Sequence, residues 1–348
     1  MPHELQAQID ALVSPSDRRR STVFDVTVSS AAGDLVLQGT VLERAQRDAV
    51  MNLAQGAAPG AIRDELVVLL ESHEYGWAGV RWGVADVRAQ PTRAAELITE
   101  AVYGEAVEVL RNVGTWSQVR QGDGYIGWIA QQSLCPNAAA AQYSAEATHV
   151  IAARWRPIVG LEGDQVGLLP WGVALPVAEF RDRMAFFISP DGLPCSIEAD
   201  ALILVDDRPA QTQAGIGEML SQLRQFVGVP YLWGGTTAYG FDCSGLAQAA
   251  YRWMGIGLPR DADQQSQRGS AVERTAVQAG DLLFWAVNRN SEQRTQNINH
   301  VAIALDSEQM IHANQHNWSV SVDSIAEIQA RFALNGDPGL VLIRRFVE

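Results

Sequence analysis

Cysteine and histidine are scarce in this sequence, with three and six residues among 348. So few thiols cannot build the disulfide framework of a small secreted domain, and they suit a reducing compartment. The first ten residues, MPHELQAQID, lack the basic stretch and the apolar core of a secretory signal, and no apolar run approaches membrane-spanning length. We therefore expect a cytoplasmic protein without a membrane segment.

Positive charge is also limited, because acidic residues outnumber basic ones and leave a net charge of −14. A surface of this sign repels nucleic acid and anionic membranes, so we expect neither as a partner. The sequence has no paired cysteines of the zinc-ligand type, and we expect neither a metal nor another cofactor. A hydrophobic content of 47% is typical of a globular protein, and the length predicts several domains.

The most informative segment is Gly234–Leu246, GGTTAYGFDCSGL. Its glycines indicate a loop, Asp242 is a favoured N-cap residue, and apolar residues recur at helical spacing after it. Cys243 therefore falls in the first turn of a predicted helix. Unpaired N–H groups and the helix dipole favour a thiolate there, so we predict a nucleophile with a lowered pKa.

Two histidines are placed to serve this thiol. His300 lies in a run of alternating apolar residues, and His312 lies in the next apolar run. If residues 306–308 form the loop of a hairpin, Ala302 faces His312 and both histidines share one face, whereas an even loop would separate them. We predict that His300 is the base and His312 its orienting group, with His316 as the alternative to His312.

Each of these residues also has an ordinary interpretation. A single buried cysteine is usually an inert small hydrophobe, and a single histidine is usually a hydrogen-bonded core residue. The combination of a cysteine at a helix start with two histidines on a predicted hairpin favours catalysis. Cys135 and Cys195 have no comparable setting, and we predict that both are structural.

Six ordered segments resemble the signature of the NlpC-type cell-wall peptidases, a papain-like family of cysteine enzymes. They are PYLWGG (230–235), FDCSGL (241–246), LPR (258–260), AGDLLF (279–284), NHVAI (299–303) and MIHA (310–313). The resemblance covers about residues 215–348. It implies hydrolysis, in peptidoglycan stem peptides, of the bond between the γ-carboxyl group of D-glutamate and the L-diamino acid that follows.

The same resemblance implies roles for individual residues. Cys243 is the nucleophile, His300 the base and His312 the third polar member. Tyr231 is similar to the family's tyrosine beside the oxyanion position. The positions that line the D-glutamate pocket are Asp242, Ser244, Arg260 and Asp261. The family often carries serine at the next position, where this chain has Ala262, so one hydroxyl contact to the substrate is missing.

Residues 1–74 predict a small α+β unit whose role is open. Alternating patterns indicate strands at 22–28 and 34–41, and helical patterns follow around 45–53 and 61–70. No motif in this unit carries chemistry. A packing or spacer role is the default interpretation.

Two β-rich segments separate this unit from the domain that carries the cysteine. Residues 75–140 predict a small barrel, and GYIGWI at 124–129 resembles the hallmark of bacterial SH3-like domains. Residues 141–208 resemble a divergent second copy with a hairpin at 186–197. The predicted fold is multidomain α+β: a small α+β N-terminal unit, two SH3-like β-barrels and a C-terminal papain-like α+β catalytic domain at 209–348.

Two such barrels before an NlpC-type domain are similar to the branch of the family that trims free murein peptides during recycling. In that branch the first barrel closes the substrate groove and admits only peptides with a free N-terminal L-alanine. Tyr125 matches the barrel tyrosine that reaches this amino end. A buried ammonium needs an acidic partner, and Glu100, Glu105 and Asp86 are the candidates.

The resemblance therefore implies a cytoplasmic γ-D-glutamyl-L-diamino acid endopeptidase, with L-Ala-γ-D-Glu-L-diamino acid as its minimal substrate. A thiol amidase or transferase on the same fold is one alternative, and a cell-wall hydrolase is another. A third is a catalytically weak protein that binds wall fragments, which the intact set of Cys243, His300 and His312 argues against. The choice of diamino acid, the oligomeric state and any protein partner stay open.

Overall fold

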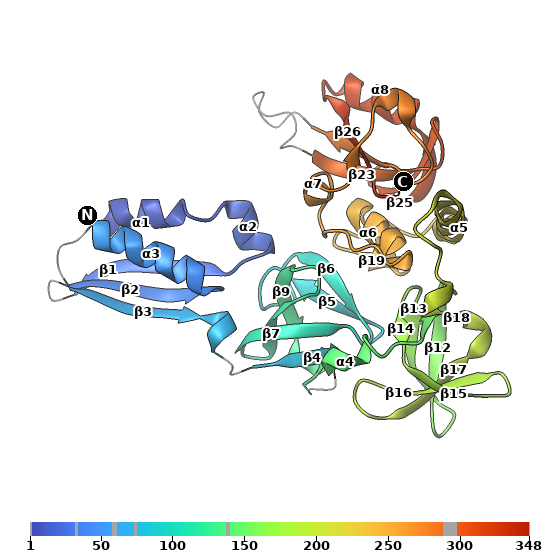
Figure 1. Cartoon of the computed structure of the whole chain (residues 1–348), viewed down its shortest axis with the longest axis horizontal. Coiled ribbons are helices and arrows are strands. Elements are labelled where there is room, and N and C mark those ends of the chain that lie inside the picture. The colour runs from blue at the N-terminus through green and yellow to red at the C-terminus, as the bar shows by residue number, and fades with distance from the viewer. Residues whose placement is uncertain are drawn as a thin grey trace.

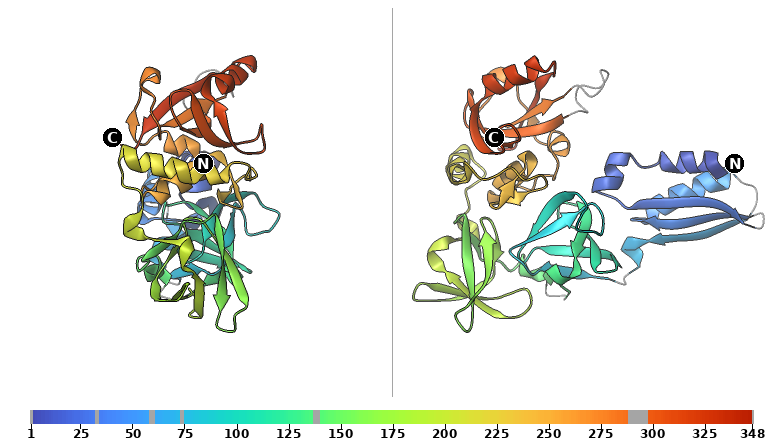
Figure 2. Two further views of the ribbon diagram at one scale, coloured as in Figure 1. Left: turned by 90° about the vertical axis from the view of Figure 1, so that its right-hand side faces the viewer. Right: turned by 180° about the vertical axis from the view of Figure 1, so that it is seen from behind.

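The computed structural model describes residues 2–31, 34–57, 61–72, 75–136, 140–287 and 298–347. Four units follow one another along the chain (Figure 1). The N-terminal unit extends to one side of the first β-rich unit, and the C-terminal unit lies over both β-rich units, as two further views show (Figure 2). Within the described ranges, no helix combines the length and apolar character needed to cross a membrane.

The N-terminal unit is a three-stranded sheet with two helices packed on one face (Figure 1). Its elements are α1 (Pro2–Asp10), α2 (Pro15–Arg20), β1 (Phe24–Ala31), β2 (Asp34–Val41), α3 (Arg44–Ala57), β3 (Ile62–Val68) and η1 (Leu69–Glu71). The helix expected over 61–70 is wrong, because this segment forms β3 and pairs in parallel with β2. Its apolar residues alternate, and α3 supplies the crossover that a parallel pair requires.

The second unit, called barrel 1 below, is one seven-stranded sheet in the order β10-β4-β7-β8-β9-β5-β6. Its elements are β4 (Trp77–Val80), β5 (Val84–Arg88), β6 (Leu97–Val102), β7 (Ala106–Val113), β8 (Trp116–Arg120), β9 (Ile126–Ala130), η2 (Gln131–Ser133) and β10 (Leu134–Cys135). Alternating residues from these strands enclose one apolar core, which includes Val87, Val107 and Ile129. Tyr125 stands directly before β9.

The third unit, barrel 2, contains two sheets, in the orders β14-β11-β18 and β13-β12-β17-β16-β15. Its elements are α4 (Ala140–Tyr143), β11 (His149–Ile151), β12 (Trp155–Gly160), β13 (Gln165–Pro170), β14 (Ala174–Leu175), β15 (Val177–Arg181), β16 (Met184–Ile188), β17 (Pro194–Glu198), η3 (Ala199–Ala201), β18 (Leu202–Leu204) and η4 (Val205–Asp207). The hairpin predicted at 186–197 is confirmed by the antiparallel pairing of β16 with β17.

The C-terminal unit packs helices against a six-stranded sheet in the order β21-β26-β22-β23-β24-β25. Its elements are α5 (Gln213–Leu223), η5 (Arg224–Phe226), β19 (Thr236–Thr237), β20 (Gly240–Phe241), α6 (Cys243–Trp253), α7 (Ala262–Gln265), β21 (Ser270–Ala271), η6 (Arg274–Ala276), β22 (Leu282–Ala286), β23 (Ile298–Ala304), β24 (Gln309–Asn314), β25 (Ser319–Ser324), α8 (Ile325–Leu334) and β26 (Gly339–Arg345). Helix α6 contributes to the apolar core that contains Val301 and Ile311, whereas α8 packs with Ala302 and Met310. Because side chains alternate along a strand, the two helices cover opposite faces of the sheet.

Apolar contacts hold the units together. Val23, Leu42 and Leu69 of the N-terminal unit form one buried cluster with Leu110 and Ile126 of barrel 1. Such burial removes apolar surface from water and fixes how the two units sit against each other.

Barrel 2 joins the C-terminal unit in the same way. Trp171 stacks on Trp253 with ring centroids 4.7 Å apart, and it also meets Phe226 edge-on at 5.2 Å. Aromatic pairs of this kind add to the free energy that area burial alone supplies.

Candidate active site

Cys243 begins helix α6, as the sequence predicts. Asp242 caps the helix by accepting a hydrogen bond from the Gly245 backbone N–H at 2.7 Å. Gly245 is required because a Cβ atom there would lie 2.1 Å from the Gly235 carbonyl oxygen. The loop before the helix therefore packs directly on the first helical turn, and it fixes the position of the half-buried thiol.

The predicted lowering of the thiol pKa is wrong. Burial raises the pKa of Cys243 to about 12, and the neighbouring Asp242 carboxylate adds to this effect. Backbone N–H groups of Ser244 and Val301 point at the sulfur and lower the pKa, but by less. The helix start therefore offers hydrogen bonds to a thiolate without ionising the resting thiol, so a base must take the proton.

The base predicted from the sequence lies in a hydrogen-bonded chain of three side chains. His300 Nε2 lies 2.7 Å from His312 Nδ1, and His312 Nε2 lies 2.9 Å from Asp323 Oδ2. The expected hairpin loop at 306–308 is confirmed, because Ile303 pairs with Ile311 on strands β23 and β24. This register brings the two histidines onto one face of the sheet.

The hydrogen bonds assign the tautomers of both rings. The hydrogen bond from His312 lowers the pKa of Asp323 to about 2, so Asp323 is a carboxylate and accepts the His312 Nε2–H. His312 Nδ1 then accepts the His300 Nε2–H, which leaves His300 Nδ1 without a proton. Burial, with His312 beside it, holds the pKa of His300 well below 6.5, so the ring is a neutral base.

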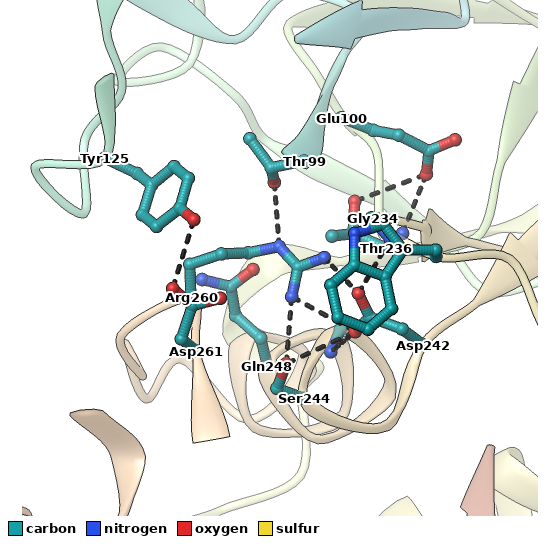
Figure 3. Close-up of polar contacts among 12 residues, drawn as sticks. Thr99, Glu100, Tyr125, Gly234, Thr236, Asp242, Ser244, Gln248, Arg260 and Asp261 are labelled. Carbon is teal, nitrogen blue, oxygen red and sulfur yellow. Dashed lines mark hydrogen bonds and ion pairs between the residues drawn. The ribbon is translucent and has the colours of Figure 1, made fainter. Parts of the chain in front are cut away.

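Buried Arg260 joins the start of α6 to barrel 1 (Figure 3). Its Nη1 and Nη2 donate to the two oxygens of Asp242 at 3.1 and 2.5 Å. Nη1 also donates to Ser244 Oγ at 2.9 Å, and Nε donates to Thr99 Oγ1 of barrel 1 at 3.0 Å. A buried carboxylate requires a partner of this kind, so Arg260 positions Asp242 and Ser244.

Tyr125 of barrel 1 reaches the start of α7 (Figure 3). Its hydroxyl donates to Asp261 Oδ2 at 3.0 Å. The three acids that the sequence offered as partners are engaged elsewhere: Glu100 accepts from the Thr236 N–H at 2.7 Å, Glu105 accepts from Gln121 at 2.8 Å, and Asp86 pairs with Arg88 at 2.5 Å. The acid beside Tyr125 is therefore Asp261.

These side chains surround a cavity of about 790 Å³. Eight of the nine predicted site residues line it: Tyr125, Tyr231, Asp242, Cys243, Ser244, Asp261, His300 and His312. Arg260 does not, and the expectation that it lines the substrate pocket is corrected, because its guanidinium is taken up by Asp242, Ser244 and Thr99. Ala262 lines the cavity where the family often carries a hydroxyl.

Two segments of the chain match known families. Residues 228–334 match the NlpC/P60 family, and residues 87–134 match the bacterial dipeptidyl-peptidase SH3 domain. The chain carries an NlpC/P60 domain. The SH3 match falls on barrel 1, and the family resemblance predicted from the sequence is confirmed.

Three bacterial dipeptidyl-peptidases are similar to this chain over most of their own length. A γ-D-glutamyl-L-lysine dipeptidyl-peptidase of Bacillus cereus is 27% identical over 259 residues, which is 71% of this chain and 76% of the relative. The Bacillus subtilis enzyme of the same name is 28% identical over 66% of this chain and 76% of its own length. Dipeptidyl-peptidase 6 of Lysinibacillus sphaericus is 25% identical over 70% of this chain and 90% of its own length.

A solved structure shows the same fold. The crystal structure of an NlpC/P60 family protein from Bacillus cereus superposes with a TM-score of 0.67 at 22% identity, and it covers 78% of this chain and 100% of that chain. The predicted fold class, with SH3-like barrels and a C-terminal NlpC/P60 domain, is confirmed.

Sequence reasoning missed Asp323, which anchors the chain of histidines in the NlpC/P60 domain. Asp323 lies on β25 opposite Met310, one diagonal step from His312, and it also accepts a hydrogen bond from Ser321 Oγ at 2.5 Å. The alternating run Ser319–Ser324 after the predicted hairpin was the available signal. His316 lines the cavity but is exposed, whereas His312 makes the contact with His300.

The four-residue spacing of His312 and His316 does not create a metal site. Both ring nitrogens of His312 are engaged, one with His300 and one with Asp323. Across the described ranges, no group of three or more histidine, cysteine, aspartate or glutamate side chains could hold a metal ion.

Barrel 1 contributes further residues that carry no local signature. Glu96 lines the cavity and accepts a hydrogen bond from Trp233 Nε1 at 2.9 Å. Buried Glu100 accepts from the Thr236 backbone at 2.7 Å (Figure 3). A glutamate inside the apolar strand β6 was the one visible hint, because a buried carboxylate requires partners.

Proposed function

We propose that this protein is a cysteine endopeptidase that cleaves γ-D-glutamyl-L-diamino acid bonds in murein peptides with a free N-terminal L-alanine. One observation carries the proposal: Cys243 and His300, the first member of the chain that runs through His312 to Asp323, line one cavity with Tyr125 of barrel 1. The named function of the relatives, γ-D-glutamyl-L-lysine dipeptidyl-peptidase, supports this choice of bond.

The first half of the reaction forms a thioester. Cys243 Sγ attacks the γ-carbonyl carbon of D-glutamate while His300 Nδ1 takes the thiol proton, because the resting thiol and imidazole are both neutral. N–H groups at the start of α6 and the Tyr231 hydroxyl stabilise the oxyanion. The tetrahedral intermediate collapses, the C–N bond breaks, and His300 gives its proton to the amine of the departing diamino acid.

The second half hydrolyses the thioester. His300 takes a proton from water, the water oxygen attacks the acyl carbon, and the C–S bond breaks as the proton returns to sulfur. His312, held by Asp323, keeps the His300 ring oriented through both halves. The products are L-Ala-D-Glu and the free diamino acid.

The amino end of the substrate lies against barrel 1 in this proposal. Asp261, with the Tyr125 hydroxyl beside it at 3.0 Å, accepts the alanine ammonium. In intact peptidoglycan this nitrogen is an amide and carries no charge, so the site favours released peptides. We therefore propose a role in murein-peptide recycling in the cytoplasm, which the scarcity of cysteine supports.

Defined peptides test this function. We expect L-Ala-γ-D-Glu-meso-diaminopimelate and L-Ala-γ-D-Glu-L-Lys to be cut only after γ-D-Glu, with products identified by mass spectrometry. The Cys243→Ser protein is the control for a contaminating peptidase. Cleavage of a muramyl-alanine bond, or acyl transfer to an added amine, would instead support an amidase or a transferase. Binding of these peptides without turnover would support a wall-fragment binding protein.

A further inference from the structure

The N-terminal unit reaches the active site through the end of one short helix. Arg20 is the last residue of α2 and lines the main cavity. Its Nε lies 2.9 Å from Asp261 Oδ2, and its Nη1 lies 2.6 Å from Asp263 Oδ2. The Arg20 side chain thus joins two carboxylates of the NlpC/P60 domain from more than 240 positions away in sequence.

Helix α2 is held firmly enough to place this side chain. Ser14 caps its first turn by accepting from the Asp17 N–H at 3.1 Å, and Arg18 donates to the Asp10 carbonyl at 2.7 Å. Val23, three residues after Arg20, belongs to the buried cluster that joins the unit to barrel 1. These contacts fix both ends of the segment that carries Arg20.

Arg20 forms part of a wall between two cavities. A second cavity of about 150 Å³ shares lining residues with the main one, and Arg18, Gln118 and Trp128 line it as well. Arg20, Ile98 and Tyr125 line both cavities. The Arg20 side chain, with 26% of its surface exposed, therefore closes the groove at the end where Tyr125 and Asp261 meet.

We propose that Arg20 restricts the substrate to an unsubstituted amino end, and that residues 2–72 form a specificity unit for the NlpC/P60 domain. An acyl group on the alanine nitrogen has to extend past Tyr125 into the wall, where it meets a guanidinium fixed by two ion pairs. Asp261 and Asp263 carry two negative charges against the one positive charge of Arg20. The cluster thus keeps one net negative charge for the ammonium of a free peptide.

This inference rests on the proposed function and is tested by selectivity. The full-length protein is assayed for kcat/KM on L-Ala-γ-D-Glu-L-Lys and on its N-acetyl derivative. Arg20→Ala joins the two cavities, so we expect kcat/KM for the acetylated peptide to rise at least tenfold while the free peptide is still cleaved. The ratio of kcat/KM for the free peptide to kcat/KM for the acetylated peptide then falls.

Arg44→Ala is the matched control, because Arg44 lies in the same N-terminal unit, pairs with Glu71 at 2.6 Å and lines neither cavity. We expect its selectivity to equal that of the wild type. An Arg44 variant that loses selectivity as strongly as Arg20→Ala would overturn the inference, because a loosened N-terminal unit would then explain both. Thermal unfolding of each variant checks that the fold is retained.

Arg20→Gln provides a second route should Arg20→Ala not fold, since it shortens the side chain and removes both ion pairs. We expect a smaller shift in the same direction. Unchanged selectivity in the folded variants would contradict the role of Arg20 and leave the proposed function intact. A wild-type protein that cleaves neither peptide would contradict the proposed function itself.

Discussion

The reactivity of Cys243 depends on its neighbours, because burial keeps the thiol protonated in the resting site. In the proposed reaction, proton transfer to His300 therefore accompanies attack on the substrate. A neutral His300 is suited to this role, since burial and His312 keep its pKa low. The chain through His312 to Asp323 stabilises the imidazolium ion that forms as the proton arrives.

Substitutions along this chain should have graded effects. We expect Cys243→Ser and His300→Ala to abolish turnover, because each removes a reacting group. His312→Ala should lower kcat by roughly 10- to 1000-fold, and Asp323→Ala by less, since nucleophile and base remain in both. Steady-state kinetics on the tripeptide measure the series. Wild-type kcat in Cys243→Ser would show that the nucleophile is assigned wrongly.

The other two cysteines provide the matched control for thiol chemistry. Cys135 and Cys195 are buried in the barrels, with exposures of 3% and 6%. We expect Cys135→Ala and Cys195→Ala to retain wild-type kcat, at a small cost in stability from lost packing. Loss of activity in either would place a second functional thiol in the protein.

The site residues that carry a local signature could be predicted, and the contacts between distant segments could not. Asp242 and Cys243 follow from local helix-capping chemistry, and the two histidines follow from hairpin register. The position of Arg260 in a buried ion pair depends on Thr99, which is 161 residues away. The pKa of Cys243 depends on burial by the assembled fold, which local sequence does not report.

At the scale of elements, strand β6 of barrel 1 packs directly against the loop that precedes α6. Thr99 accepts from Arg260, and Glu100 accepts from the Thr236 backbone. Both contacts act on the segment that positions Cys243. Barrel 1 thereby supports the nucleophile as well as lining the groove.

The β3 segment shows why one element was predicted wrongly. Its pattern of apolar residues is short, and it suits either a helix or a strand. Pairing with β2 decides the outcome, and α3 separates the two strands in sequence, so the pairing is not visible in the local pattern. The hairpins at β16–β17 and β23–β24 could be predicted because their partners are adjacent in sequence.

Burial of Glu100 makes the interface sensitive to pH. Desolvation raises the pKa of its carboxyl from 4.5 to about 7. The folded protein therefore favours the protonated form, and the stability that this form contributes is present below about pH 4.5 and lost as the pH rises to about 7. A shift of this size corresponds to about 3 kcal/mol.

Glu100→Gln should remove this dependence, because the amide oxygen still accepts the Thr236 N–H and carries no charge. As the pH rises from 4.5 to 8, the wild type should lose about 3 kcal/mol of unfolding free energy that the variant keeps. Urea unfolding followed by tryptophan fluorescence at several pH values measures the difference. Parallel pH profiles for the two proteins would show that Glu100 does not titrate in this range.

At the scale of the whole molecule, three units contribute to one groove. The NlpC/P60 domain supplies the reacting groups, barrel 1 supplies Tyr125, and the N-terminal unit supplies Arg20. One buried apolar cluster joins the N-terminal unit to barrel 1. Because residues of all three units line this groove, we expect the substrate's amino end to be selected by size and charge only in the assembled protein.

The last prediction concerns this selection in the wild-type protein. Acetylation of the alanine nitrogen removes the positive charge and adds bulk. Tyr125 and Asp261 then have no ammonium to bind. An unmade charged hydrogen bond costs on the order of 2 to 5 kcal/mol, so kcat/KM should fall by roughly thirtyfold to several thousandfold. Intact sacculi should be almost inert for the same reason. Tyr125→Phe should narrow the gap between free and acetylated peptides, since it removes one of the groups that recognise the ammonium. Similar rates on free tripeptide and on sacculi would point instead to a cell-wall hydrolase.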